Sequence, residues 1–221
     1  INSAGATFTE NKATAGSGGA IYNAIGATYT SNGDTFTGNT SKYGGAIYNQ
    51  GTMVFNGDTT FTDNSAFSEG GAIYNSYDTI TFSRDAIFIN NLASSYGGAI
   101  KNAATITFEE SSTAIFTNNS ASSGGAIWNY GATLTFKGDA TFTRNTATKG
   151  SGAISNVDHG IITFDGDTTF TDNSASSGGA ISAGGIITFN DNFLFSGNTA
   201  NEGADIYNTG TINFAPAENK V

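Results

Sequence analysis

Short apolar runs recur along the chain at a nearly constant spacing, separated by segments rich in Gly, Asn, Asp and Ser. One block reads Gly-Gly-Ala-Ile, then a variable residue, then Asn, as at 18–23, and a second block reads Phe-x-x-Asn. A third run, Thr79–Phe82 for example, alternates polar and apolar residues between those two blocks. Short alternating runs bounded by turn-forming residues are typical of β-strands. The pattern therefore predicts three short strands in every repeat.

The two blocks recur in step with each other along the whole chain. The Ala of the first block falls at 20, 46, 72, 99, 126, 153 and 180, with a degenerate copy at 203–206, and the second block begins at Phe8, Phe36, Phe61, Phe88, Phe116, Phe142, Phe170 and Phe195. Successive copies are 25 to 28 residues apart. A propeller blade needs about 40 residues or more, and a leucine-rich repeat needs Leu, which this chain almost lacks.

A parallel β-helix fits this period, with each repeat forming one coil. We therefore expect an all-β, right-handed parallel β-helix (solenoid) of about eight coils, because parallel crossovers are overwhelmingly right-handed. Residues 1–221 form a single domain in this interpretation, with a polar C-terminal tail at 215–221.

Comparison of the copies predicts which side chains face the core. The Ile of the first block is present in every copy and is expected to point inward, as is the Phe of Phe-x-x-Asn, which would stack as an aromatic column. The position after the Ile accepts Lys and Ser as well as aromatic residues, so it is expected to point outward. The Asn of Phe-x-x-Asn is expected to form a ladder at the following turn.

Composition and charge exclude several classes of protein. The 30 Gly, 32 Thr and 25 Asn against three Leu exclude a helical protein. A net charge of −10 makes nucleic acid a poor partner, because phosphate binding needs clustered Lys and Arg. The absence of Cys excludes disulfides and thiolate metal sites. No apolar run approaches the ~20 residues of a membrane-spanning helix.

Alternating Gly-Gly-Ala-Ile and Phe-x-x-Asn blocks resemble the passenger domains of the polymorphic outer membrane proteins of Chlamydia and related bacteria, which are type V autotransporters. The resemblance extends from Phe8 to Phe214. It implies a cell-surface, extracellular passenger that acts as an adhesin toward a host surface protein or glycan, attached to the outer membrane through a β-barrel outside these residues. In that family both tetrapeptides are associated with adhesion, and the pair here is Gly44, Gly45, Ala46 and Ile47 with Phe61 and Asn64.

An outward column of aromatic residues is the first candidate binding site. It consists of Tyr22, Tyr48, Tyr74, Trp128 and Tyr207. Exposed rings one strand spacing apart would give a stacking surface for sugars or a partner protein. The alternative is that these rings pack under an adjacent loop or stabilise the sheet by stacking on one another.

Two further arrays are candidates for binding. Thr flanks the inward Phe at Thr35/Thr37, Thr60/Thr62, Thr141/Thr143 and Thr169/Thr171, as in ice-binding β-helices, although Ile87/Ile89 interrupts the array and Thr is an ordinary strand residue. Asp34, Asp58, Asp85, Asp139 and Asp167 precede the Phe strand. Stacked carboxylates could hold Ca²⁺, but local capping of each turn is the better interpretation.

We expect no catalytic residue, cofactor or metal site, so the chain is predicted not to be an enzyme. The few basic residues do not recur with acidic partners, and coils of uniform length supply no long loops to wall a cleft. The favoured function is attachment to host cells, or a rigid scaffold for that attachment; a carbohydrate- or ice-binding array is the alternative, and a polysaccharide-degrading β-helix enzyme is the third. Homotypic self-association through the coil ends is also open.

Overall fold

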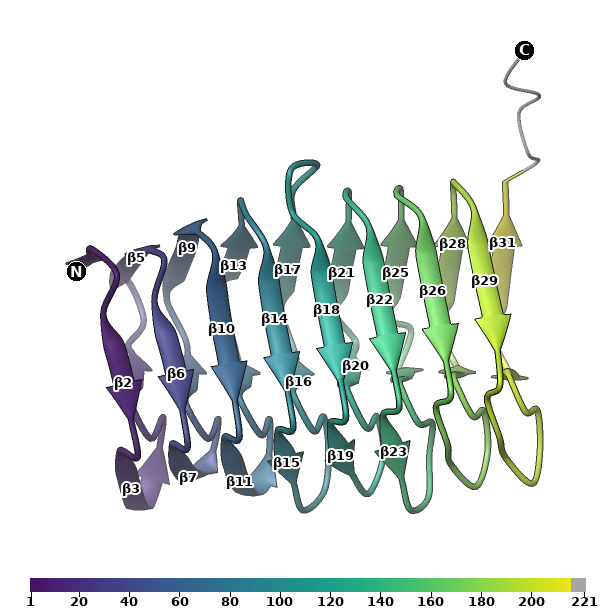
Figure 1. Ribbon diagram of the computed structural model, residues 1–221, viewed down its shortest axis with the longest axis horizontal. Coiled ribbons are helices and arrows are strands. Elements are labelled where there is room, and N and C mark those ends of the chain that lie inside the picture. Colours follow the sequence, from purple (N-terminus) through teal and green to yellow (C-terminus); the bar gives the residue numbers. More distant parts are fainter. Residues whose placement is uncertain (216–221) are drawn as a thin grey trace.

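The chain forms a parallel β-solenoid of eight coils, in which each strand pairs in parallel with its equivalents in the neighbouring coils (Figure 1). This computed structural model describes residues 1–215. Strands β1 to β31 form four sheets, and the described residues contain no helix, hence none that could cross a membrane. The predicted polar tail of 215–221 falls, from Pro216 on, outside the described residues.

Three of the sheets correspond to the three predicted strands of each repeat. Sheet A contains β1 (Asn2–Ser3), β5 (Thr28–Asn32), β9 (Thr52–Gly57), β13 (Thr79–Phe82), β17 (Thr105–Phe108), β21 (Thr133–Phe136), β25 (Ile161–Phe164), β28 (Ile186–Phe189) and β31 (Thr211–Phe214). Sheet B contains β2 (Thr7–Thr9), β6 (Thr35–Thr37), β10 (Thr59–Thr62), β14 (Ala86–Ile89), β18 (Ala114–Thr117), β22 (Ala140–Thr143), β26 (Thr168–Thr171) and β29 (Phe193–Ser196). Sheet D contains β4 (Ile21–Asn23), β8 (Ile47–Asn49), β12 (Ile73–Asn75), β16 (Ile100–Asn102), β20 (Ile127–Tyr130), β24 (Ile154–Val157), β27 (Ile181–Ala183) and β30 (Ile206–Asn208).

A fourth, shorter sheet follows the Asn of Phe-x-x-Asn and was not predicted. Sheet C contains β3 (Lys12–Ser17), β7 (Thr40–Tyr43), β11 (Ser65–Glu69), β15 (Leu92–Ala93), β19 (Ser120–Ala121) and β23 (Thr146–Ala147). Several of these strands are only two residues long and show no apolar alternation, so periodicity does not reveal them.

The hand of the solenoid is visible in Figure 1. The chain runs down the near sheet B and up the more distant sheet A while it advances from left to right. That path is a right-handed coil, as the general preference for right-handed parallel crossovers predicts.

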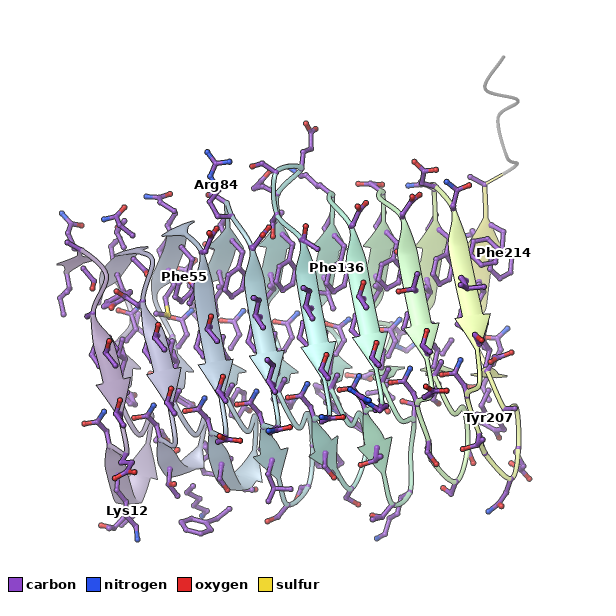
Figure 2. The ribbon with its side chains drawn as sticks, in the orientation of Figure 1. Lys12, Phe55, Arg84, Phe136, Tyr207 and Phe214 are labelled. Atoms are coloured by element: carbon purple, nitrogen blue, oxygen red, sulfur yellow. The ribbon has the colours of Figure 1, made fainter. Side chains whose placement is uncertain are left out.

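Two columns of stacked phenylalanine rings fill the core, and the column formed by the Phe-x-x-Asn residues is confirmed. From Phe8 to Phe195 its successive rings lie 4.8 to 5.0 Å apart and within 7° of parallel. The second column runs along sheet A and includes Phe55, Phe136 and, at the C-terminal end of the solenoid, Phe214, which are labelled in Figure 2. The two columns meet edge to face, an arrangement that aromatic rings favour.

The Phe-x-x-Asn block forms a strand end followed by a left-handed residue. In the third coil Phe61 is buried, Asp63 has a φ of 56° and is exposed, and Asn64 returns to the interior. The Asn64 side chain accepts from the backbone N–H of Asn39, and its Nδ2 donates to the Phe36 carbonyl and to Asn91 Oδ1. The predicted Asn ladder is therefore confirmed, and it satisfies backbone groups that the turn would otherwise leave unpaired inside the protein.

The Gly-Gly-Ala-Ile block forms a corner at which successive coils approach closely. Gly44 has a φ of 62°, and a Cβ there would lie 1.9 Å from the Ile47 carbonyl oxygen. Gly45 has ordinary backbone angles, but a Cβ on it would lie 2.0 Å from the carbonyl oxygen of Gly71 in the next coil. Glycine is thus required at the first position because of the positive φ, and at the second because the next coil leaves no room for a Cβ.

Asp34, in the second coil, links that coil to the first strand of sheet A and to Ala6 of the first coil. Its buried carboxylate accepts from Ser3 Oγ at 2.5 Å, from the Ala6 backbone N–H at 2.7 Å and from Tyr29 Oη at 2.5 Å. Burial acts to raise the pKa of Asp34, but the hydrogen bonds, led by those from Ser3 and Tyr29, outweigh it and hold this pKa below its usual value.

Acidification is expected to destabilise the wild type relative to Asp34→Asn. A lowered folded pKa contributes stability above the unfolded carboxyl pKa of about 3.9, and this contribution is lost as the pH falls through the folded pKa. Urea unfolding of both proteins at pH 7 and pH 2 measures the change. A difference in unfolding free energy between the two proteins that is the same at both pH values would contradict this assignment.

Candidate functional site

The predicted aromatic column lies on the outer face of sheet D, one residue after the buried Ile of each coil. Tyr22, Tyr48 and Tyr74 pair in register across β4, β8 and β12, and the column continues through Lys101 and Trp128. Tyr22 is 54% exposed, whereas Tyr48, Tyr74 and Trp128 are partly buried. Tyr207, in the last coil, is 38% exposed and is separated from the others by Ser155 and Ser182. We call Tyr22, Tyr48, Tyr74, Lys101 and Trp128 the aromatic face.

Mutual stacking accounts for the partial burial of this face. The rings of Tyr22 and Tyr48 stack at 5.3 Å, and Tyr48 meets Tyr74 edge to face at 5.2 Å. Two residues beside the face add further rings: Tyr43, at the end of β7, contacts Tyr74, and Tyr96, which follows β15, contacts Trp128. The structure thus contains both arrangements considered for these residues: rings that pack on each other and under adjacent chain, and rings that stay open to solvent.

Lys101 is the most deeply covered member of the aromatic face. It points away from the core, as predicted, yet it is only 5% exposed. Its Nζ lies 5.5 Å from the ring centre of Tyr74 and 4.7 Å from that of Tyr130, so both contacts are cation–π interactions. Burial lowers the pKa of Lys101 and raises that of Tyr74 to about 12. The middle of the face is therefore a packed cluster with a charged centre.

The family motif residues lie inside the protein. Gly44, Gly45, Ala46, Ile47, Phe61 and Asn64 are all buried. Their side chains fill the core, close the corner between coils or pair in the Asn ladder. In the folded chain these six residues therefore build the coil, and a partner that binds the surface cannot contact their side chains.

A second Asn ladder was missed by the sequence analysis. Six buried residues near the end of the sheet D strands form it, and each of the first five donates through Nδ2 to Oδ1 of the next: Asn23, Asn49, Asn75, Asn102, Asn129 and Asn156. The signal was present as the Asn that ends the block Gly-Gly-Ala-Ile-x-Asn. This ladder fixes the position of the corner between sheets D and A.

The threonine array lies on the outer face of sheet B. Thr141/Thr143 and Thr169/Thr171 pair in register, but Ile87, Ile89 and Ile115 occupy the equivalent positions in the fourth and fifth coils. The array is therefore divided into two parts by an apolar patch.

The aspartates before sheet B form hydrogen bonds between coils. Asp85 Oδ1 accepts from the backbone N–H of Thr113, and Asp139 Oδ1 accepts from that of Asp167. The expected local caps at these two residues are thus replaced by bonds to the next coil. Among residues 1–215, no group of three or more His, Asp or Glu is arranged to hold a metal ion.

Comparison with known families found one match. The model of the Chlamydia polymorphic membrane protein (Chlamydia_PMP) repeat matches residues 5–24, 35–50, 58–76, 85–103, 113–130 and 167–184. Each of the six matched segments contains a Phe-x-x-Asn block and the Gly-Gly-Ala-Ile block that follows it. Searches of curated proteins and of solved structures found no match.

Proposed function

Because this chain belongs to the family of Chlamydia polymorphic membrane protein repeats, we propose that it is a passenger domain displayed on the outer surface of a bacterium, where it attaches the cell to a host surface. The proposed role is binding without catalysis, in keeping with the family. The rod supplies the mechanism: it holds the same outward positions at regular intervals, so weak contacts on successive coils add through multivalency.

One observation supports the choice of the adhesive surface. The motif residues of the second to seventh coils are buried, whereas the outward position beside the motif carries aromatic residues in four of the first five coils. Aromatic side chains supply large contact areas at little cost in conformational entropy and are enriched where proteins bind partners. We therefore place adhesion on the aromatic face and the adjacent Tyr96, and we assign the motifs the task of presenting that face. The interrupted threonine array gives the ice-binding alternative less support.

A pair of surface variants tests this assignment. We expect Tyr22→Ser combined with Tyr96→Ser to weaken binding of the purified chain to cultured epithelial cells at least tenfold, or about 1.4 kcal/mol. Ile161→Ser combined with Ile186→Ser is the matched control, because these residues are 44% and 42% exposed on the outer face of sheet A. Flow cytometry with labelled protein measures binding, and circular dichroism verifies the fold. Equal loss of binding in the two pairs would contradict a role for the aromatic face.

A further inference from the structure

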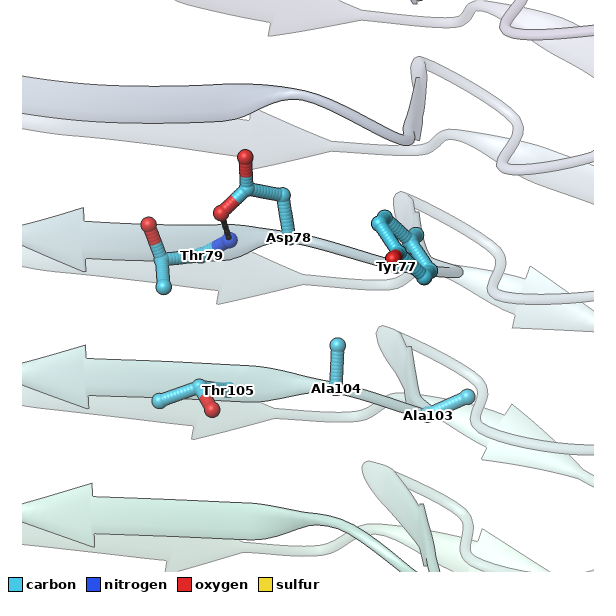
Figure 3. A pocket seen from close by; sticks show the side chains of 6 residues that line it. All are labelled: Tyr77, Asp78, Thr79, Ala103, Ala104 and Thr105. Carbon is cyan, nitrogen blue, oxygen red and sulfur yellow. Dashed lines mark hydrogen bonds between the residues drawn. The ribbon is translucent and has the colours of Figure 1, made fainter. Parts of the chain in front are cut away.

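A hollow lies at the corner between sheets D and A, in the third and fourth coils. It has a volume of about 490 Å³ and is lined by Tyr77, Asp78, Thr79, Ala103, Ala104 and Thr105 (Figure 3). No residue of the hollow belongs to the aromatic face, and the sequence analysis did not single it out.

The hollow exists because one corner is shorter than its neighbours. Asn75, Asn102 and Asn129 stack in register, so the corners that follow them begin at the same level. Three residues connect Asn75 to sheet A and three connect Asn129 to it, but only Ala103 and Ala104 follow Asn102. The short corner with its two methyl side chains thus forms one side of the hollow, and the longer corner at Tyr77 and Asp78 forms the other.

Tyr77 forms an aromatic wall of this hollow. Its side chain is 65% exposed and has neither a hydrogen bond nor a ring contact to any other described residue. This sets it apart from Tyr22 and Tyr48, whose hydroxyls donate to Gln50 and Ser76 and whose rings stack. The ring of Tyr77 is therefore an unpartnered apolar surface beside a concave site.

Polar groups of fixed position complete the site. Asp78 Oδ1 accepts from the Thr79 backbone N–H at 2.8 Å, and Asp78 Oδ2 accepts from Thr52 Oγ1 at 3.1 Å. Both bonds hold the carboxylate in place, and an ionised carboxylate has about four acceptor sites, so further donors can bind to it. Thr105 lines the other side of the hollow, and its hydroxyl has no hydrogen-bond partner among the described residues.

From this arrangement we propose that the hollow binds one ring of a neutral, hexose-type sugar. A pyranose ring presents a face of C–H groups that packs on an aromatic ring, and its adjacent hydroxyls donate to a carboxylate and exchange hydrogen bonds with a threonine. The Asp78 carboxylate and the net charge of −10 disfavour acidic sugars. This inference rests on the proposed function, because it takes the sugar to be part of a neutral glycan on the host surface.

Saccharide titration followed by NMR tests the site directly. With D-galactose and N-acetyl-D-glucosamine as probes, we expect at least one to shift the amide signals of residues 77–79 and 103–105, with a dissociation constant on the order of 1 mM. N-acetylneuraminic acid is expected to shift none of them. Tyr77→Ala is expected to weaken binding at least tenfold, and Asp78→Asn several-fold. Tyr207→Ala is the matched control, since Tyr207 is also exposed and unpartnered but lies in the last coil.

Three results would overturn the proposal: no shift of these amides with either neutral sugar, shifts that survive Tyr77→Ala, or stronger binding of the acidic sugar. Each of these is separable from failure of the adhesive role. If cells still bind the chain, and binding still depends on Tyr22 and Tyr96, adhesion stands and the sugar site alone is wrong. If the sugar binds but Tyr22 and Tyr96 are dispensable for cell binding, the sugar site stands and the assignment of adhesion to the aromatic face is wrong.

Discussion

Gly98→Ala is expected to lower the free energy of unfolding by about 3 to 5 kcal/mol, one of the largest effects available to a single methyl group in this chain. Gly98 is the second glycine of its block. A Cβ on it would lie 2.0 Å from the Gly125 carbonyl oxygen and 2.6 Å from the backbone N and O of Ser120. All three atoms belong to the backbone of the next coil, so no side-chain rotation relieves the clash, and the two coils must separate.

Gly16→Ala is the matched control for this substitution. Gly16 lies in β3, its backbone angles are ordinary, and a Cβ there would meet no atom within 4 Å. It is expected to change stability by less than about 0.5 kcal/mol. Urea unfolding followed by circular dichroism measures both variants. A Gly98→Ala protein with the same urea midpoint as Gly16→Ala would show that the coils can move apart without cost, which contradicts the close-contact explanation of the motif.

The periodic features of this chain could be predicted from sequence because each of them recurs in every coil. The positions of Ile47 and Phe61 carry Ile and Phe in all eight copies of the repeat. Comparison of eight copies within one sequence reveals a constraint that a single occurrence would hide. The Asn ladder that includes Asn64 was predicted from the same repetition. Packing in a solenoid joins equivalent positions of adjacent coils, so the sequence period directly reports the contacts.

Features that differ between coils were not predicted. Alternation along β16 assigns Lys101 to the outer face, but it does not show that rings from two neighbouring coils close over the ammonium group. The hollow beside Tyr77 depends on a corner one residue shorter than its neighbours, which has meaning only once the coils are stacked in register. Candidate binding sites in this molecule therefore arise where the repeat is broken, while the fold arises where it is kept.

Under the proposed function, this division gives a route by which the buried motifs would act on adhesion. Replacement of a motif residue would act on the presented surface by loosening the coil beneath it. The effect on binding should then follow the population of folded protein, and it should vanish under conditions in which the variant is fully folded.

Asn91→Ala provides the second large effect and tests that division. Asn91 Oδ1 accepts from the backbone N–H and from Nδ2 of Asn64, while its Nδ2 donates to the Phe61 carbonyl and to Asn119 Oδ1, each at 3.0 Å. The substitution leaves buried polar groups on two neighbouring coils without partners. At about 1 to 3 kcal/mol for each unsatisfied group, and with partial relaxation of the ladder, we expect a loss of about 3 to 5 kcal/mol in the free energy of unfolding.

The neighbouring asparagine supplies the control, because Asn90 belongs to the same motif but is exposed, with a φ of 56°. Asn90→Gly keeps that conformation available and is expected to be nearly neutral in urea unfolding. At a temperature at which both variants are folded, each should bind cells as the wild type does, since neither changes the outer surface of sheet D. If folded Asn91→Ala bound cells more weakly than Asn90→Gly, the motif would act in recognition itself, and its assignment as a purely architectural element would be wrong.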